Sequence, residues 1–296
     1  MTSLASVIFI LCVLTSQAFS QQINFSCIAS GKSVILKYQW KDNQERVSDD
    51  TVIIPRKTAE IALSEFRAFE TLDLSTKRII DSKMPEILAP YGCWPVANEK
   101  GDLLIAGPNV QSMQLAGDAI IKERERVVND IYSSNYYRLN EKGEVEVDYA
   151  AIVNRYVPVM HIVAESIFTT TGDKRSAVAH YLDFIRTIPY SYDFSNHANF
   201  QTPLGMLLEN KGDCDTKAVA FATLMKSFGL PVILIGLPNH MIVGIELEPT
   251  KEDYAVRYKG KTYILSETSS DSYKLGQVSE HSYQPIEKQD YSVIEP

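Results

Sequence analysis

The spacing of apolar residues in the first half of the chain predicts two strands followed by three helices. Residues 34–40 and 52–54 are rich in β-branched and aromatic side chains and flank a polar turn at residues 41–44, which is typical of paired strands. Helical spacing follows in three segments, at residues 58–69, 77–88 and 111–132. Catalytic residue types do not cluster in this half.

The second half begins with further helical patterns. Residues 148–169 and 176–188 have helical spacing, and Asp173 is placed to cap the second of these helices. Pro189 ends that helix, because proline cannot continue the hydrogen-bond ladder. Thr202 followed by Pro203 has the form of an N-cap with proline at the first helical position.

After Gly212 the pattern changes from a helix to a series of strands. One apolar helix face is formed by residues at helical spacing: Cys214, Ala218, Phe221, Met225 and Phe228. Gly229 and Pro231 are placed to end this helix. Four strands are predicted next, at residues 232–237, 241–247, 254–258 and 262–265. Lys259 and Gly260 form a natural tight turn between the last two.

These patterns predict an α+β protein with a domain boundary near residue 140. The stretch at residues 139–144 is polar and contains Gly143, which favours a connection between domains. We expect residues 21–140 to form an accessory α+β domain of unknown role. Residues 145–296 are then a second domain, in which helices pack on an antiparallel sheet.

Composition limits the class of protein and of partner. The chain has 296 residues, of which 45% are apolar and 22% charged, which excludes a disordered, collagen-like or disulfide-dense scaffold. Its net charge of −8 argues against general nucleic-acid binding and against adhesion to anionic membranes.

The first twenty residues predict a signal peptide. Residues 1–20 have no charged side chain, residues 4–14 form an apolar run, and Ala18-Phe19-Ser20 supplies small residues before Gln21. The run is too short for a membrane anchor, which needs about 20 apolar residues. We therefore expect an exported protein, periplasmic or extracellular, with no membrane insertion after the signal is removed.

In an exported protein, the number of cysteines bears on which disulfides can form. Cys12 leaves with the signal, so the mature chain keeps Cys27, Cys93 and Cys214. An odd number in an oxidising compartment suggests one disulfide and one free thiol. Because Cys214 has a different sequence context, we expect a disulfide between Cys27 and Cys93. The alternative, a lipid anchor on Cys27, is disfavoured because the residues before it do not resemble a lipoprotein signal.

Cys214 is predicted to begin a helix, where an anion is stabilised. The unpaired N–H groups and the macrodipole of a helix N-terminus favour a thiolate, and the same N–H groups can stabilise a developing oxyanion. A single cysteine at a helix start is more often buried and inert. The chemical interpretation therefore depends on finding partners for it elsewhere in the chain.

His240 and Glu267 are the candidate partners. His240 opens one predicted strand and Glu267 closes another, so antiparallel pairing of these strands would bring both side chains to one sheet edge. His240 would then act as the general base, oriented by Glu267. His240 and Glu267 would not meet if residues 254–258 formed a strand between these two strands in the sheet. Taken singly, each residue has the simpler interpretation of a surface side chain.

Three sequence blocks resemble the transglutaminase-like superfamily of papain-like cysteine enzymes, closest to bacterial exported members. The blocks are residues 201–218 with Gly212-Asp213-Cys214-Asp215, residues 239–245 with Asn239-His240, and residues 263–268 with Glu267-Thr268. The resemblance covers roughly residues 148–278. Many relatives have Asp-Pro at the third block, and this chain has Glu-Thr.

The resemblance implies a papain-like core in residues 145–296 and assigns roles to its residues. Cys214 would be the nucleophile, His240 the general base and acid, and Glu267 the residue that orients His240. Such enzymes take a second oxyanion donor from a side chain upstream of the cysteine, and Gln201 has a suitable amide. A capping or loop role for Gln201 is the alternative.

The implied function is acyl transfer on peptide or carboxamide bonds through a thioester. Water as the acceptor gives a peptidase or amidase, and an amine gives a transglutaminase. A protein or peptide of the cell envelope is the expected substrate, and neither a metal nor a cofactor is expected. The alternative is a non-catalytic binding or scaffold protein that retains the fold.

Overall fold

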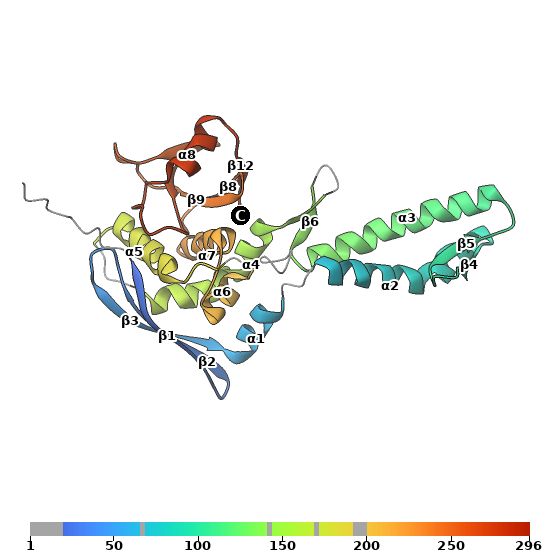
Figure 1. Cartoon of the computed structure of the whole chain (residues 1–296), viewed down its shortest axis with the longest axis horizontal. Helices are drawn as coiled ribbons and strands as arrows, with labels where there is room; N and C mark the ends of the chain where they lie inside the picture. Colours follow the sequence, from blue (N-terminus) through green and yellow to red (C-terminus); the bar gives the residue numbers. More distant parts are fainter. Residues whose placement is uncertain (1–19, 66–68, 141–143, 169–171, 192–199) are drawn as a thin grey trace, which may run out of the picture.

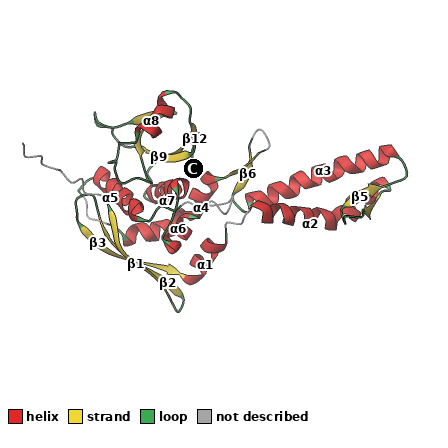
Figure 2. Ribbon diagram, viewed as in Figure 1, coloured by secondary structure: helices red, strands yellow, loops and turns green. Residues whose placement is uncertain are grey.

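The computed structural model of the chain describes residues 20–65, 69–140, 144–168, 172–191 and 200–296. Within them, two sheets lie on opposite sides of a layer of helices, and a long arm extends from one side (Figure 1, Figure 2). Every pairing between named strands in these residues is antiparallel. The described structure is therefore consistent with the predicted α+β class.

The first sheet has the order β1-β2-β3. Its strands are β1 (Gln21–Ser30), β2 (Ser33–Lys41) and β3 (Val47–Pro55). The strands β2 and β3 confirm the two predicted strands, but β1 does not follow from the sequence pattern. It is an edge strand with no buried residue, so neither of its faces has the apolar alternation that marks a half-buried strand.

In the described part of the chain, the central layer consists of four helices. They are α4 (Tyr149–Ser166), α5 (Lys174–Thr187), α6 (Pro203–Glu209) and α7 (Cys214–Ser227). The predicted caps are confirmed: the side chain of Asp173 accepts the N–H of Ser176, and that of Thr202 accepts the N–H of Gly205. The helix α7 lies in the middle of the layer, and its residues from 216 to 225 are all buried.

The second sheet has the order β10-β11-β9-β8-β12. Its strands are β8 (Val232–Leu237), β9 (His240–Ile245), β10 (Ala255–Tyr258), β11 (Lys261–Ser266) and β12 (Ser292–Ile294). Leu234 and Val243 on one face join the main core with α7, whereas Ile235 and Ile242 on the other face form a second cluster. A short C-terminal helix, α8 (Glu280–Glu287), packs against that second cluster.

The arm is an antiparallel helical hairpin with a small sheet. It contains α2 (Phe69–Leu88), β4 (Trp94–Ala97), β5 (Leu103–Ala106) and α3 (Val110–Ser133). It has a small core of its own, which includes Met84, Leu88 and Ala116. At its base, Leu72 and Tyr132 pack with Tyr137 of a short hairpin formed by β6 (Tyr137–Leu139) and β7 (Val145–Val147).

The predicted domain boundary near residue 140 does not separate two cores. Buried side chains of β2, β3 and α1 (Arg56–Ser64) belong to the same cluster as those of α5 and α7, as Leu36 and Phe184 show. Tyr38 contacts Phe184 with ring centroids 5.1 Å apart, and its hydroxyl donates to the carbonyl of Leu207 at 2.7 Å. The first sheet is thus an integral layer of the second half, and only the arm stands apart.

This division predicts different effects for two deletions. Replacing residues 77–126 of the arm by a short glycine-serine linker should leave the thermal unfolding midpoint nearly unchanged, because the arm has its own core. Removing residues 21–64 should abolish cooperative unfolding, because it uncovers the apolar faces of α5 and α6. Circular dichroism melting measures both. An equal loss of thermal stability from the two deletions would contradict the conclusion that the arm has a core separate from the main one.

The predicted disulfide between Cys27 and Cys93 is not formed. Both cysteines are free, as is Cys214: Cys27 is exposed on β1, and Cys93 is buried in the arm just before β4. Figure 1 shows β1 and β4 at opposite ends of the molecule. The prediction of this disulfide was wrong because the number of cysteines carries no information on how far apart the fold places them.

The predicted signal peptide lies almost wholly outside the described residues, which begin at Ser20. Of the helices that the structure describes, none combines the length and the apolar character needed to cross a membrane.

Candidate functional site

Cys214 is the first residue of α7, as the sequence predicts. The side chain of Asp213 caps the helix by accepting the N–H of Thr216 at 3.2 Å. Cys214 itself is partly exposed, although most of α7 is buried. The thiol therefore lies at the positive end of a helix dipole and within reach of a ligand.

His240 is the first residue of β9, directly opposite Leu237 at the end of β8. Pro238 and Asn239 form the connection between these strands. Asn239 has a φ of 59°, which asparagine tolerates better than most residues and which fits the third position of a type II turn. This tight hairpin places the His240 ring at the rim of the sheet, where 16% of its side chain is exposed.

Glu267 follows β11, and the sheet order brings it to His240. The strands β9 and β11 are direct neighbours, with Ser266 opposite Val243, and β10 lies outside β11 at the edge. The arrangement that would have separated the two residues is therefore absent from this sheet. The Nε2 atom of His240 is 2.6 Å from Oε1 of Glu267, which confirms the predicted contact.

Cys214 is also close enough to the His240 ring to contribute to the pKa of the imidazole. Because Nε2 faces Glu267, Nδ1 is the ring nitrogen available to the sulfur. Burial by itself lowers the pKa of His240, but the hydrogen bonds and charges of Cys214 and Glu267 outweigh it and raise the pKa to about 10. The imidazole is therefore held as an imidazolium through neutral pH, hydrogen-bonded to Glu267.

Glu267 is nearly enclosed by hydrogen-bond donors. Its Oε1 accepts the hydroxyl of Ser269 at 3.2 Å in addition to His240, and its Oε2 accepts the hydroxyl of Ser282 at 2.8 Å. Burial by itself raises the pKa of Glu267, but the bonds to His240, Ser282 and Ser269 bring it below its ordinary value. The carboxylate is thus ionised although only 3% of its side chain is exposed.

The backbone of Glu267 is held by hydrogen bonds from Arg186. This arginine is at the end of α5, and its Nε and Nη2 atoms donate to the Glu267 carbonyl at 2.9 and 2.6 Å. Its side chain is only 2% exposed, and Nη1 lies 3.7 Å from the carboxylate of Asp183. Sequence reasoning missed Arg186 and Ser282, because both reach Glu267 from elements distant in the chain.

A second cation, Lys217, is buried beside Arg186. Its ammonium group donates to the Arg186 carbonyl at 3.4 Å. Burial and the charge of Arg186 lower the pKa of Lys217 to about 8, and burial lowers that of Arg186 to about 10. Lys217 and Arg186 together place positive charge next to the backbone of Glu267.

Gln201 lies beside α7, but its side chain is engaged elsewhere. Its backbone N–H donates to the hydroxyl of Thr216 at 3.4 Å, so the chain passes the first turn of the helix. Its side-chain amide donates to Glu209 at 2.6 Å. In this conformation, the amide expected to stabilise an oxyanion is bonded to a carboxylate.

Asp215 is a further polar residue of the first turn of α7. Its carboxylate accepts the hydroxyl of Tyr149 at 2.8 Å and the N–H of Thr216 at 2.9 Å. Burial and the neighbouring Asp213 raise the pKa of Asp215. Protonation of Asp215 therefore removes negative charge from the vicinity of Cys214 more readily than an exposed aspartate would.

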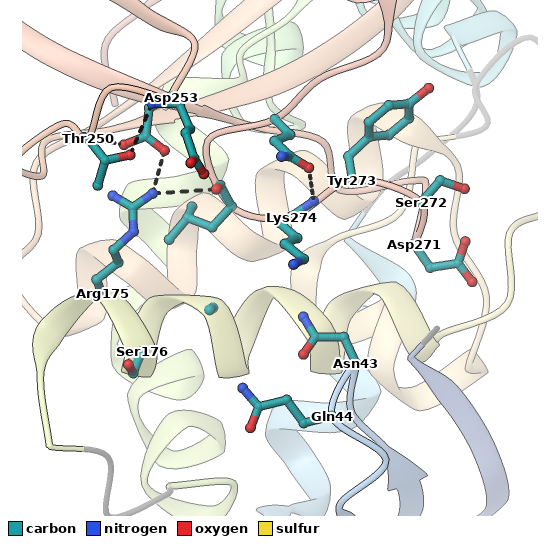
Figure 3. Close-up of a pocket in the computed structure, with 14 residues that line it drawn as sticks. Asn43, Gln44, Arg175, Ser176, Thr250, Asp253, Asp271, Ser272, Tyr273 and Lys274 are labelled. Atoms are coloured by element: carbon teal, nitrogen blue, oxygen red, sulfur yellow. Dashed lines mark hydrogen bonds and ion pairs between the residues drawn. The ribbon is translucent and has the colours of Figure 1, made fainter. Parts of the chain in front are cut away.

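The structure also contains a polar cavity away from these residues (Figure 3). It has a volume of about 590 Å³ and lies between the β2–β3 turn, the first half of α5 and two loops of the second half. Figure 3 shows side chains of both charges around it, among them Arg175, Asp271 and Lys274. Cys214, His240 and Glu267 do not line it, although one of its loops continues from Glu267.

Among the residues that the structure describes, no three histidine, cysteine, aspartate or glutamate side chains are grouped so as to hold a metal ion. Comparisons with protein-family models, with curated proteins and with solved structures give no match.

Proposed function

We propose that this protein is an exported cysteine-dependent acyl-transfer enzyme that acts on peptide or carboxamide bonds. The observation that supports it is the chain of contacts from Cys214 through His240 to Glu267. Each of the three has the chemistry that its role requires, and the three come from the start of a helix, the start of a strand and the end of the neighbouring strand.

In the proposed reaction, the Cys214 thiolate attacks the carbonyl carbon of the substrate. The N–H groups at the start of α7 stabilise the oxyanion that forms. The imidazolium of His240 gives its proton to the leaving nitrogen, so the C–N bond breaks and a thioester remains on Cys214. Water or an amine then gives a proton to His240 and attacks the thioester, which releases the product and restores the thiolate.

The arrangement of elements supports a papain-like, transglutaminase-like core as part of this proposal. A helix that begins with the nucleophile packs on an antiparallel sheet, and two adjacent strands of that sheet supply the base and its orienting carboxylate. Export predicts a protein or peptide substrate of the cell envelope. The arm, with its own core, is a separate element of this chain.

A specific observation favours the scaffold alternative. The amide of Gln201 bonds Glu209, so the proposed second oxyanion donor is not available in this conformation. A non-catalytic binding protein has no need of that donor. Turnover requires that Gln201 release Glu209 or that another group supply the second hydrogen bond.

Turnover can be tested with a glutamine-rich, unfolded protein substrate. We expect ammonia release in the absence of an amine acceptor, or incorporation of a fluorescent primary amine when one is supplied. Cys214→Ala should abolish both activities, because it removes the nucleophile, and the exposed Cys27→Ala variant serves as the matched control. Activity that survives in Cys214→Ala would overturn the assignment.

A further inference from the structure

Glutamate needs more support than aspartate to orient a histidine. It has one more rotatable side-chain bond, so more rotamers must be excluded for one oxygen to face the imidazole. Glu267 is 2% exposed and points from the end of β11 toward His240. The contacts around its second oxygen decide whether this orientation is unique.

Ser282 supplies the contact to that second oxygen. It lies in the first turn of α8, only 1% of the residue is exposed, and its hydroxyl is 2.8 Å from Oε2 of Glu267. The Oγ atoms of Ser279 and Ser282 are 2.9 Å apart, and the Oγ of Ser279 also accepts the N–H of Ser282 at 3.0 Å.

Counting protons fixes the direction of these bonds. A carboxylate has no proton to donate, so the single hydroxyl proton of Ser282 must point to Glu267. Ser279 must then donate its own hydroxyl proton to the oxygen of Ser282, because that oxygen has no second proton. The result is a directed series of hydrogen bonds from Ser279 to Ser282 to Glu267, which also accepts from His240 on its other oxygen.

We propose that Ser282 is a positioning residue that fixes the Glu267 carboxylate with Oε1 facing His240, so that α8 is part of the catalytic apparatus. This inference rests on the proposed function of Cys214, His240 and Glu267. Ser282 does not touch the reacting atoms. It acts through Glu267, and therefore through the imidazolium that stabilises the Cys214 thiolate.

The test is the rate at which iodoacetamide alkylates Cys214, followed by peptide mass spectrometry in the full mature chain. At pH 6 the thiolate depends on a well-held imidazolium, whereas at pH 10 ordinary thiols are largely ionised. For Ser282→Ala we expect a rate about five to ten times lower at pH 6, because only part of the strength of a hydrogen bond to a charged group is passed through Glu267 and His240 to Cys214. At pH 10 the rate should be within about twofold of wild type.

Two variants separate positioning from a structural role. Ser282→Thr keeps the hydroxyl and should restore most of the rate at pH 6. Ser279→Ala removes the cap of α8 but leaves the Ser282 donor, so it should lower the melting temperature more than it lowers the rate at pH 6. Equal losses at both pH values in Ser282→Ala would indicate a structural role and overturn the proposal.

The same experiment distinguishes failure of the two proposals. If Cys214 in the wild-type protein reacts at pH 6 no faster than the exposed Cys27 of the same chain, the catalytic assignment fails. If Cys214 is the faster of the two and Ser282→Ala leaves its rate unchanged, the catalytic assignment stands and the role of Ser282 is refuted.

Discussion

Replacing His240 by alanine is expected to lower the alkylation rate of Cys214 at pH 6 by a factor of about 10 to 20. An ordinary thiol has a pKa of about 8.5, so less than about 1% of it is ionised at pH 6. Full ionisation therefore raises the alkylation rate, but the lower nucleophilicity of a stabilised thiolate offsets part of this increase. In the proposed mechanism, the stabilising charge is the imidazolium of His240, whose pKa is raised to about 10.

The chain contains its own reference for this measurement. Cys27 is exposed on β1, far from the site, and partial burial raises the pKa of its thiol. Its alkylation should rise with pH at higher values than for an ordinary thiol and should be the same in wild type and His240→Ala. A Cys214 profile that coincides with that of Cys27 in the wild-type protein would exclude an activated nucleophile and favour the scaffold alternative.

Replacing Arg186 by alanine should lower the free energy of unfolding by about 3 to 5 kcal/mol, a large loss for a single substitution. It removes two hydrogen bonds from the Glu267 carbonyl and leaves Asp183 buried without its cationic neighbour. Burial already raises the pKa of Asp183 to about 6, against the opposing charge of Arg186. Without Arg186 that pKa should rise further.

The sign of the pH dependence follows from Asp183. A carboxyl group whose pKa is higher in the folded state than in the unfolded state favours folding at low pH, and this contribution is lost as pH rises. The cost of Arg186→Ala should therefore be smaller at pH 5, where Asp183 can take a proton, than at pH 8. Urea unfolding of wild type and variant at both pH values measures the difference.

Two controls calibrate this prediction. Arg126→Ala removes an exposed arginine that pairs with Glu123 and Asp130 in the arm, and it should cost less than about 1 kcal/mol. The double variant Arg186→Met with Asp183→Asn removes both charges and should recover part of the loss. A cost of Arg186→Ala no larger than that of Arg126→Ala would show that the Glu267 carbonyl does not depend on the buried guanidinium.

Local chemistry explains which parts of the fold the sequence could predict. The caps Asp173 and Thr202, the start of α7 and the strands β8 to β11 are set by neighbouring residues and by apolar spacing, and the structure confirms them. The strand β1 and the arm hairpin of β4 and β5 are solvent-exposed on much of their surface, so no clear alternation marks them. The disulfide between Cys27 and Cys93 was predicted from the number of cysteines and the different context of Cys214, and it is wrong.

For the site, the sequence by itself determined the three chemical groups and where each lies on its own element. It identified Cys214 at a helix start, His240 at a strand start and Glu267 at a strand end, because capping and strand patterns are local. Their meeting depended on the order of strands in the sheet, which is a long-range property: the outer position of β10 leaves β9 and β11 adjacent.

Only the tertiary structure decided what holds Glu267 in place. Arg186 reaches it from 81 residues upstream and Ser282 from 15 residues downstream, and neither belongs to a pattern that marks its partner. The tertiary structure also made the first sheet a layer of the same core, because the buried faces of β2 and β3 pack on helices such as α4 and α5, which follow much later in the chain. Burial and long-range hydrogen bonding are settled by packing of the whole chain, whereas helix starts and strand patterns are settled within a few residues.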